Sequence, residues 1–232
     1  MTAGAGVIEA AGVVVPAHDE EELLPACLMA LRCAAAAVSI PVHVIVVADT
    51  CTDRTAAAAR ACGASVVSIR ARNVGAARAA GLTALLQFTA GCDPAGTWLA
   101  TTDADTVVPS GWLRRQLEYA DAGWDVVLGT VTVASWDGHP PHVPDAFERR
   151  YAFGAGPHPH VHGANLGIRA SAYLAADGFP PLPTAEDHAL VAAATEAGCA
   201  VLRAADLAVE TSSRRQARAP EGFGHLLRTL AG

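Results

Sequence analysis

The feature that most constrains the fold of this chain is a repeated alternation of short, almost continuously apolar segments with longer helical patterns. Four apolar segments in the first half fit buried strands, at residues 12–17, 42–49, 65–69 and 97–103. Helical patterns lie between them over residues 20–37, 52–63 and 73–90. Apolar strands joined by helices are typical of a parallel sheet covered on both faces. We therefore predict an α/β fold, a Rossmann-type sandwich with a mostly parallel central sheet and helices on both faces.

The second half has a less regular pattern. Strands are expected at residues 125–135, 165–169 and 200–210, and helices near 145–153 and over 185–198. Between the first strand and the second lies a stretch rich in proline, histidine and glycine. No linker or internal repeat divides the chain, and 232 residues suit one doubly wound domain. We predict a single domain over residues 1–232 that ends in an arginine-rich tail, residues 211–232.

Composition excludes several classes of protein. A formal net charge of −7 argues against a nucleic-acid binder, which needs a basic face. No apolar run approaches the length of a membrane span, and the first ten residues lack the basic and apolar regions of a signal peptide. The six scattered cysteines have no zinc-type spacing, so we expect reduced, mostly buried thiols. These features predict a cytoplasmic protein with no integral membrane segment and no nucleic-acid partner.

Polar residues follow each strand of the first half at the point where the strand ends. They are Ala17 to Glu20, Asp49 to Asp53, Arg70 to Asn73, and Asp103 to Asp105. Ligands of open α/β sheets bind beyond the carboxyl ends of the strands. We therefore expect all four groups to gather along one edge of the sheet.

Each of these groups has a simpler interpretation beside the functional one. Asp103 and Asp105 could form a polar turn or hold a hard cation such as Mg²⁺ or Mn²⁺. Asn73 is a natural helix cap, and acidic residues at the start of the helix over 20–37 would suit its dipole. Arg78 could form an exposed salt bridge or contact a diphosphate, and Gly81 could serve only close packing against the sheet. Residue types alone leave these alternatives open.

Five short motifs, taken in order, resemble those of family-2 glycosyltransferases with the GT-A fold. They are VVVPAHDEEELL, VVADTCTDRT, RNVGAARAAG, TDADT and AEDHAL, and they cover roughly residues 12 to 198. The resemblance implies a metal-dependent, inverting hexosyltransferase that moves a sugar from a UDP- or GDP-sugar to a hydroxyl acceptor. Residues 12–110 would form the nucleotide-sugar half and residues 111–210 the acceptor half.

The resemblance also implies roles for individual residues. Those that would contact the donor nucleotide are Pro16, Ala17, His18, Glu20, Asp49, Asn73, Arg78, Asp103, Arg214 and Arg218. Asp105, together with Asp103, would hold the Mg²⁺ or Mn²⁺ that offsets charge on the leaving group. Asp187 matches the general base that deprotonates the acceptor hydroxyl, and Glu186 is the alternative base.

The chain departs from the family pattern in three places. His18-Asp19 stands where an asparagine commonly precedes Glu20, and Asp177-Gly178 stands for a glycine pair in the acceptor-shaping segment 162–179. Many relatives carry a histidine metal ligand after the last core strand. Here Glu210, His225 or water would be the third ligand.

Two further features have competing interpretations. His158, His160 and His162 alternate, so they would share one face of an extended segment, where they could line the acceptor pocket, bind zinc or form a surface loop. Arg214, Arg215 and Arg218 could fold over the diphosphate or stay solvated. The closing GFGHLLRTL is amphipathic enough to dock on this domain or on a second subunit, so a homo-oligomer is possible.

Two other functions fit parts of the pattern. A sugar nucleotidyltransferase would carry a glycine-rich loop with a lysine after the first strand, and VVVPAHDEEE has neither. A non-catalytic nucleotide-sugar-binding protein would not need Asp103, Asp105 and Asp187, which are all present. The sequence identifies neither the sugar nor the acceptor.

Overall fold

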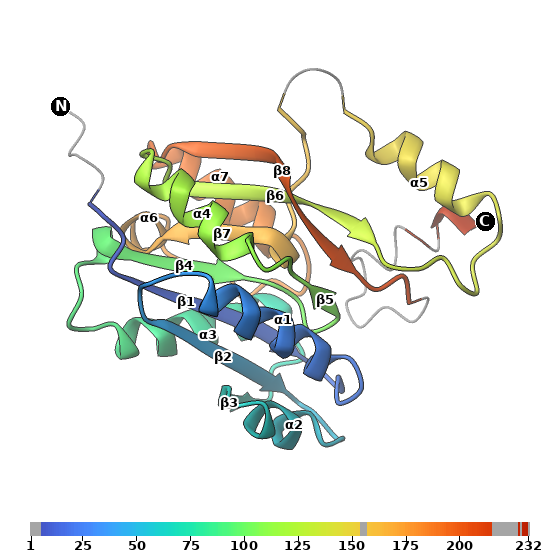
Figure 1. Cartoon of the computed structure of the whole chain (residues 1–232), viewed down its shortest axis with the longest axis horizontal. Helices are drawn as coiled ribbons and strands as arrows, with labels where there is room; N and C mark the ends of the chain where they lie inside the picture. The colour runs from blue at the N-terminus through green and yellow to red at the C-terminus, as the bar shows by residue number, and fades with distance from the viewer. Residues whose placement is uncertain (1–5, 154–156, 215–226, 228, 232) are drawn as a thin grey trace.

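All strands of the described chain belong to one eight-stranded sheet. The computed structural model describes residues 6–153, 157–214, 227 and 229–231. The strand order is β3-β2-β1-β4-β7-β6-β8-β5 (Figure 1). The strands are β1 (Ala10–Ala17), β2 (Val42–Asp49), β3 (Ser65–Ile69), β4 (Thr97–Thr101), β5 (Thr106–Val107), β6 (Val126–Val133), β7 (Leu166–Arg169) and β8 (Val201–Thr211). The helices are α1 (Leu24–Ala36), α2 (Thr55–Ala61), α3 (Val74–Phe88), α4 (Trp112–Asp121), α5 (Val143–Tyr151), α6 (Ala170–Ala175) and α7 (Glu186–Glu196), with 3₁₀ turns η1 (Pro94–Gly96) and η2 (Gly163–Asn165).

Both faces of the sheet are covered by helices, which confirms the predicted α/β sandwich. In Figure 1, α1 and α4 lie in front of the sheet and α3, α6 and α7 lie behind it. Successive residues of β1 enter opposite cores: Val13 and Val15 pack on the α1 side, and Val14 packs on the α3 side. A strand buried on both faces needs apolar residues at every position, which explains the continuous apolar runs of the sequence.

Pairing in the sheet is parallel in the first half and mixed in the second. β1 pairs in parallel with β2 and β4, and β2 pairs in parallel with β3. β7 is antiparallel to both β4 and β6, whereas β6 and β8 run parallel. The mostly parallel sheet that we predicted is therefore present, and two strands run against it: β7, and the short β5, which is antiparallel to β8.

Helix α3 lies close to the sheet because small residues face it. A Cβ atom on Gly81 would lie 2.5 Å from Val14 Cγ1 and 2.8 Å from Val47 Cγ2, which is closer than side-chain carbons approach. A Cβ on Gly12 of β1 would lie 2.6 Å from Leu85 Cδ1 of the same helix. The interpretation of Gly81 as a packing residue is therefore confirmed.

A buried asparagine joins three elements of the second half. The β6–β8 pairing shifts register between Leu128 and Thr130. The fully buried Asn165 lies at this bulge and donates from Nδ2 to the carbonyls of Thr130 and Leu207, both at 2.8 Å. Its Oδ1 accepts a hydrogen bond from Trp112 Nε1 at 2.8 Å. The amide group is thus used in fixing η2 against β6, β8 and α4. Asn165 belongs to segment 162–179, which we expected to shape an acceptor pocket, but its side chain lies in the core.

Several sequence predictions about local structure are wrong. Helix α1 begins at Leu24, so no acidic residue lies in its first turn. All six cysteines are free thiols, but only Cys27 is buried and Cys33 is exposed. The elements β5, α4 and α6 were not predicted. Within the described part of the chain, no helix combines the length and apolar character needed to cross a membrane.

The close contact of α3 with the sheet predicts the effect of adding a side chain at Gly81. We expect Gly81→Val to lower the free energy of unfolding by about 1–3 kcal/mol, because the added methyl groups overlap Val14 and Val47. Chemical denaturation followed by circular dichroism measures this change. Gly91→Ala is the control: Gly91 is exposed, nothing lies within 4 Å of a Cβ placed there, and we expect a change within about 0.5 kcal/mol. Equal stabilities of Gly81→Val and the wild type would contradict this account of the packing.

Candidate active site

The polar groups that follow β1, β2, β3 and β4 gather at one edge of the sheet, as predicted. His18 Nδ1 lies 2.7 Å from the Asp49 carbonyl oxygen, and the Glu20 amide donates to Thr55 Oγ1 at 2.8 Å. Asp19 Oδ1 accepts a hydrogen bond from the Thr52 amide at 2.6 Å. The loops after β1 and β2 are therefore bonded to each other, and the parallel register of their strands brings them to the same edge.

Asp49 anchors the loop that leads into α3. Its carboxylate accepts three backbone hydrogen bonds, from the amides of Ala71 at 2.7 Å, Arg72 at 2.9 Å and Asn73 at 2.8 Å. Burial raises the pKa of this carboxyl, but the three amides outweigh burial and the net effect is a lowered pKa. The side chain is buried and its oxygens are engaged, so its position is explained by loop structure, and the predicted nucleotide contact stays a prediction.

Asn73 caps helix α3, as its residue type suggested. Its Oδ1 accepts a hydrogen bond from the Ala76 amide, and its Nδ2 donates to the Pro181 carbonyl, both at 2.9 Å. Gly75, two residues after Asn73, has no room for a side chain, because a Cβ there would lie 2.3 Å from the Pro180 carbonyl oxygen. The start of α3 is therefore joined to the segment before α7.

Asp103 and Asp105 lie in the tight turn between β4 and β5. The Thr106 amide donates to the Asp103 carbonyl at 3.1 Å, and the Ser212 amide donates to the Asp105 carbonyl at 3.1 Å. The side chain of Asp103 is 37% exposed and that of Asp105 is 12% exposed. The carboxylate of Asp103 is therefore more accessible to solvent than that of Asp105.

Arg214, which follows β8, forms ion pairs with two of the acidic residues. Its guanidinium binds both oxygens of Glu20, at 2.7 and 2.6 Å, in the fork geometry that is characteristic of arginine and carboxylate. The same Nη2 atom lies 3.2 Å from Asp105 Oδ2. Glu20 is therefore bound to a side chain of this chain and does not point freely into a nucleotide site.

Arg78 is buried between the two halves of the sheet. Its Nη2 atom lies 2.6 Å from Asp103 Oδ1, and its Nη1 atom forms an ion pair with Glu186. A Cβ on Gly163 would lie 2.3 Å from Arg78 Cζ, so only glycine leaves space for the guanidinium. The interpretation of Arg78 as an exposed salt bridge is wrong, since the residue is only 3% exposed.

The acidic edge carries more negative than positive charge. Among the described residues, four carboxylates, those of Glu20, Asp103, Asp105 and Glu186, pair with two guanidinium groups, which leaves two negative charges in this group. Burial raises the pKa of Asp105 to about 6; Arg214 opposes this effect, and the neighbouring Asp103 and Glu20 add to it. An oxygen-only group with two surplus negative charges suits a divalent cation such as Mg²⁺ or Mn²⁺.

Asp187 is held at the start of α7 by two backbone amides. Its Oδ2 accepts a hydrogen bond from Gly163 N and its Oδ1 from His188 N, both at 2.8 Å. It is partly exposed, whereas its neighbour Glu186 is only 3% exposed and paired with Arg78. Of the two candidate bases, Asp187 is the one with access to a ligand.

A cavity of about 360 Å³ is lined by Phe147, Arg150, Tyr151, His160 and His162. Its last lining residue, His162, directly precedes Gly163, whose amide binds Asp187. The rings of Tyr151 and His160 stack with centroids 3.9 Å apart. Tyr151 Oη also lies 3.0 Å from His162 Nε2. Burial lowers the pKa of His162 to about 4, the nearby Asp187 charge opposes this effect, and the other histidines add to it. His162 is therefore a neutral ring at physiological pH.

The three alternating histidines share one face, as predicted, and the Nε2 atom of each is close to another group of the protein. Their rings stack in sequence, with centroids 5.9 Å apart for each consecutive pair. Each Nε2 lies near a protein partner: the Leu128 carbonyl for His158, the Tyr151 carbonyl for His160 and Tyr151 Oη for His162. His158 is fully buried, so only the other two line the cavity. Among the described residues these histidines form no group with metal-binding spacing.

Several predicted site residues lie elsewhere or outside the described chain. Glu210 is exposed on β8 opposite Val107, and among the described residues it forms no metal-binding group with Asp103 and Asp105. Pro16 and Ala17 lie at the end of β1, paired with β2. The remaining candidates lie outside the described residues: Arg215, Arg218, His225 and most of the segment 222–230.

The sequence prediction missed three of the residues that line the cavity. Phe147, Arg150 and Tyr151 belong to α5, which Figure 1 shows beyond the ends of β6 and β8. Their spacing of three and four places them on one face of the helix. That spacing was available in the sequence. The stacking of Tyr151 on His160 was not, because it joins two segments across an irregular stretch.

Comparison with known proteins identifies the family. The model of the family described as Glycosyl transferase family 2 matches residues 12–174 of this chain. No curated protein matches the chain. Many solved structures share its fold, and three of them are described below.

The first is S. aureus TarS 1-349 in complex with UDP-GlcNAc, with a TM-score of 0.64 and 16% identity over 95% of this chain and 65% of TarS. The second is the mannosyltransferase PcManGT from Pyrobaculum calidifontis in complex with GDP-Man and Mn²⁺, with a TM-score of 0.63 and 19% identity over 95% and 60% of the two chains. The third is glucosyl-3-phosphoglycerate synthase from Mycobacterium tuberculosis in complex with Mn²⁺, UDP and phosphoglyceric acid, with a TM-score of 0.56 and 18% identity over 96% and 76%.

Identities this low show the common fold, and this chain spans just under two thirds of the TarS chain. The family model, in contrast, covers more than half of the chain and includes the ends of β1, β2 and β4. The chain therefore belongs to glycosyl transferase family 2, and its sheet has the GT-A arrangement of that family's solved structures.

Proposed function

We propose that this chain is a metal-dependent, inverting glycosyltransferase that moves a sugar from a UDP- or GDP-sugar to a hydroxyl acceptor. The observation that carries the proposal is the surplus of negative charge that the described residues place around Asp103 and Asp105, together with the partly exposed Asp187, whose neighbour Glu186 shares Arg78 with Asp103. Complexes of TarS with UDP-GlcNAc and of PcManGT with GDP-Man and Mn²⁺ support the donor class and the cation. Residues 12–110 would hold the donor, and residues 111–210 would hold the acceptor.

Asp105 and Asp103 are the residues that would hold Mg²⁺ or Mn²⁺. Both offer only oxygen ligands, and the surplus charge at this edge would be balanced by a divalent cation. When bound, the cation supplies positive charge that stabilises the nucleoside-diphosphate leaving group. Glu210 as third protein ligand stays a prediction, with water as the alternative.

The donor would lie across the carboxyl ends of β1, β2 and β4. His18 and Asp49 would face the nucleoside, because they lie where β1 and β2 end. Arg214 would face the diphosphate, since its planar fork binds phosphate oxygens in the same way as it binds the Glu20 carboxylate. Arg78 would keep Asp103 in place, because it is buried beneath that carboxylate.

The acceptor would enter from the cavity side and meet Asp187. The Gly163 amide orients this carboxylate, which would take the proton of the acceptor hydroxyl as the oxygen attacks the anomeric carbon. Attack from the side opposite the leaving diphosphate inverts the configuration at that carbon. The cavity rings of Tyr151 and His160 offer an apolar face on which an acceptor could stack.

The proposed cation site predicts a metal-dependent response to the donor. With Mn²⁺ present, a matching UDP- or GDP-sugar at about 100 times its Kd should stabilise the wild type by about 2.7 kcal/mol. Asp105→Ala should lose the part of this gain that depends on Mn²⁺, because the cation loses a ligand. A thermal-shift titration with and without Mn²⁺ measures both.

Glu9→Gln is the matched control for this experiment. Glu9 is exposed and precedes β1, at the opposite end of the strand from the site. It should behave as the wild type. If no nucleotide sugar stabilises the wild type in a Mn²⁺-dependent way, the proposal is wrong.

The proposed base predicts a separation of donor binding from transfer. We expect Asp187→Asn to keep a donor affinity close to that of the wild type and to lower kcat about 100- to 10,000-fold, because the amide cannot accept the hydroxyl proton. Its Oδ1 can still accept one backbone hydrogen bond, so the start of α7 should persist. Calorimetric donor binding and product formation measure the two effects.

Glu196→Gln, at the exposed far end of α7, should leave both quantities unchanged. An Asp187→Asn variant with full kcat would exclude Asp187 as the base. Tight donor binding without transfer by the wild type would instead favour a nucleotide-sugar-binding protein.

A further inference from the structure

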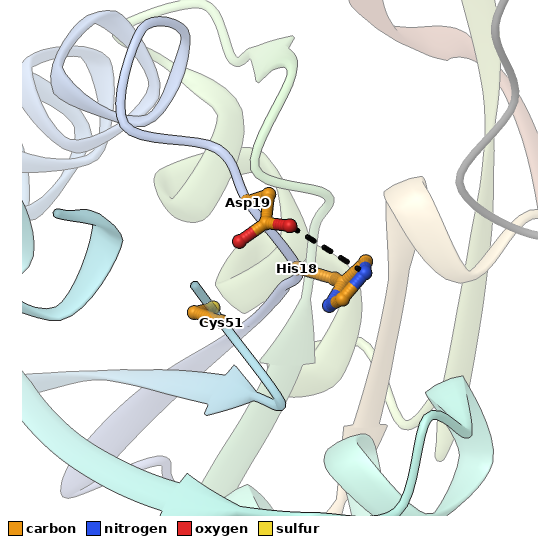
Figure 2. Close-up of side chains that lie close together, drawn as sticks. All are labelled: His18, Asp19 and Cys51. Carbon is orange, nitrogen blue, oxygen red and sulfur yellow. Dashed lines mark ion pairs between the residues drawn. The ribbon is translucent and has the colours of Figure 1, made fainter. Parts of the chain in front are cut away.

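Three side chains with different ligand chemistry meet beside the end of β2. An imidazole nitrogen of His18, a carboxylate oxygen of Asp19 and the sulfur of Cys51 all lie within 4.8 Å of one another. Figure 2 shows the three side chains gathered from the loops after β1 and β2, with His18 Nε2 3.8 Å from Asp19 Oδ2. Among the described residues this is the one group of three or more such side chains with metal-binding spacing.

The imidazole of His18 is prepared to act as a ligand. Its Nδ1 lies 2.7 Å from the Asp49 carbonyl oxygen, which can only accept, so Nδ1 carries the hydrogen. In the neutral ring this leaves the lone pair on Nε2, the atom that faces Asp19. Metal-binding histidines nearly always donate their second ring N–H in this way to a carbonyl or carboxylate.

The carboxylate of Asp19 is held in a fixed orientation. Its Oδ1 accepts hydrogen bonds from the amides of Thr52 at 2.6 Å and Asp53 at 3.3 Å. Its Oδ2 accepts a hydrogen bond from Thr52 Oγ1 at 3.2 Å and lies 3.8 Å from His18 Nε2. Two ligands of a tetrahedral zinc ion are about 3.3–3.7 Å apart when each is 2.0–2.3 Å from the metal, so this pair needs little movement to share one ion.

The backbone that presents the three ligands is strained. Asp19 has a φ of 51° and Thr50 a φ of 54°, both in the left-handed region. Aspartate tolerates this region, whereas a β-branched threonine rarely adopts it. Thr50 is nevertheless held there by its Oγ1, which donates to Asp49 Oδ1, and by its amide, which donates to the Ile69 carbonyl. Strain that the surrounding bonds maintain is a feature of functional sites. Cys51 directly follows the strained Thr50, and its Sγ lies 3.4 Å from the Ala17 carbonyl oxygen, at the end of β1.

We propose that His18, Asp19 and Cys51 form a second cation site, selective for Zn²⁺ or a similar borderline metal. Imidazole and thiolate ligands favour Zn²⁺, and oxygen-only groups such as Asp103 with Asp105 favour Mg²⁺ and Mn²⁺. The ion replaces the thiol proton, which is released to solvent, and a water molecule completes the tetrahedral set. The two sites therefore differ in chemistry and can be occupied independently.

Cobalt titration of the full chain tests this site. Co²⁺ replaces Zn²⁺ in such sites, and a cysteine thiolate bound to it gives a charge-transfer absorption that oxygen ligands do not give. With excess Mg²⁺ present to occupy the Asp103–Asp105 site, we expect the band to saturate at one Co²⁺ per chain. Zn²⁺ should then remove the band by displacing cobalt.

Variants of the ligands and one matched cysteine complete the test. Cys51→Ser should abolish the band, and Asp19→Asn, which keeps an oxygen for the Thr52 amide, should weaken cobalt binding about tenfold or more. Cys33→Ser, which removes an exposed thiol of α1, should leave band and affinity unchanged. No band in the wild type, or a band that persists in Cys51→Ser while circular dichroism shows an intact fold, would overturn the proposal.

Zinc should also weaken donor binding, and this consequence rests on the proposed function. His18 cannot both ligate zinc and face the nucleoside, so Zn²⁺ should raise the donor Kd of the wild type and of Cys33→Ser but not that of Cys51→Ser. The cobalt band needs no donor. A band without any donor binding would therefore contradict the proposed function alone, and donor binding without a band would contradict the zinc site alone.

Discussion

The arrangement of this site depends on the ion pairs that the buried guanidinium of Arg78 forms with Asp103 and Glu186. Arg78 is buried, it belongs to α3 in the first half of the chain, and it pairs with Asp103 after β4 and Glu186 at the start of α7. Removing one partner of a buried ion pair leaves an uncompensated charge, which costs about 3–5 kcal/mol. The two halves of the sheet are therefore held in one relation, which fixes Asp187 relative to Asp103. Gly163 permits this arrangement because it leaves space for the guanidinium.

Most of the fold could be predicted from the sequence, because a strand that is buried on both faces appears as a continuous run of apolar residues. Val13, Val14 and Val15 are apolar in succession since they enter two different cores, and the same holds along β2. The gathering of polar groups at one edge followed from parallel strand direction alone. Elements without such a pattern were missed: β5 has two residues and α6 has six, which is too short for a period to appear. Helix α4 was missed although its buried Trp112, Gln116 and Ala120 are spaced by four.

The candidate site was predictable in its residues but less so in their partners. Asp103, Asp105 and Asp187 could be named from motifs, because chemistry dictates residue type. The partners of Glu20, Asp49 and the buried arginine could not, since each depends on contacts far apart in the sequence. Glu20 binds an arginine 194 residues later, and Asp49 binds amides more than 20 residues away. Carboxylates that looked free to bind a ligand are in fact partly committed to the protein.

The pairing of Glu20 with Arg214 has a consequence for how the molecule forms on the ribosome. The two residues are separated by 194 positions, so at about 5–20 residues per second Arg214 is synthesised roughly 10–40 seconds after Glu20. During that interval β1 to β4 can assemble, yet Glu20 and Asp105 lack their shared counter-charge. The charged contacts of the acidic edge can therefore be completed only at the end of synthesis, when the segment after β8 is present.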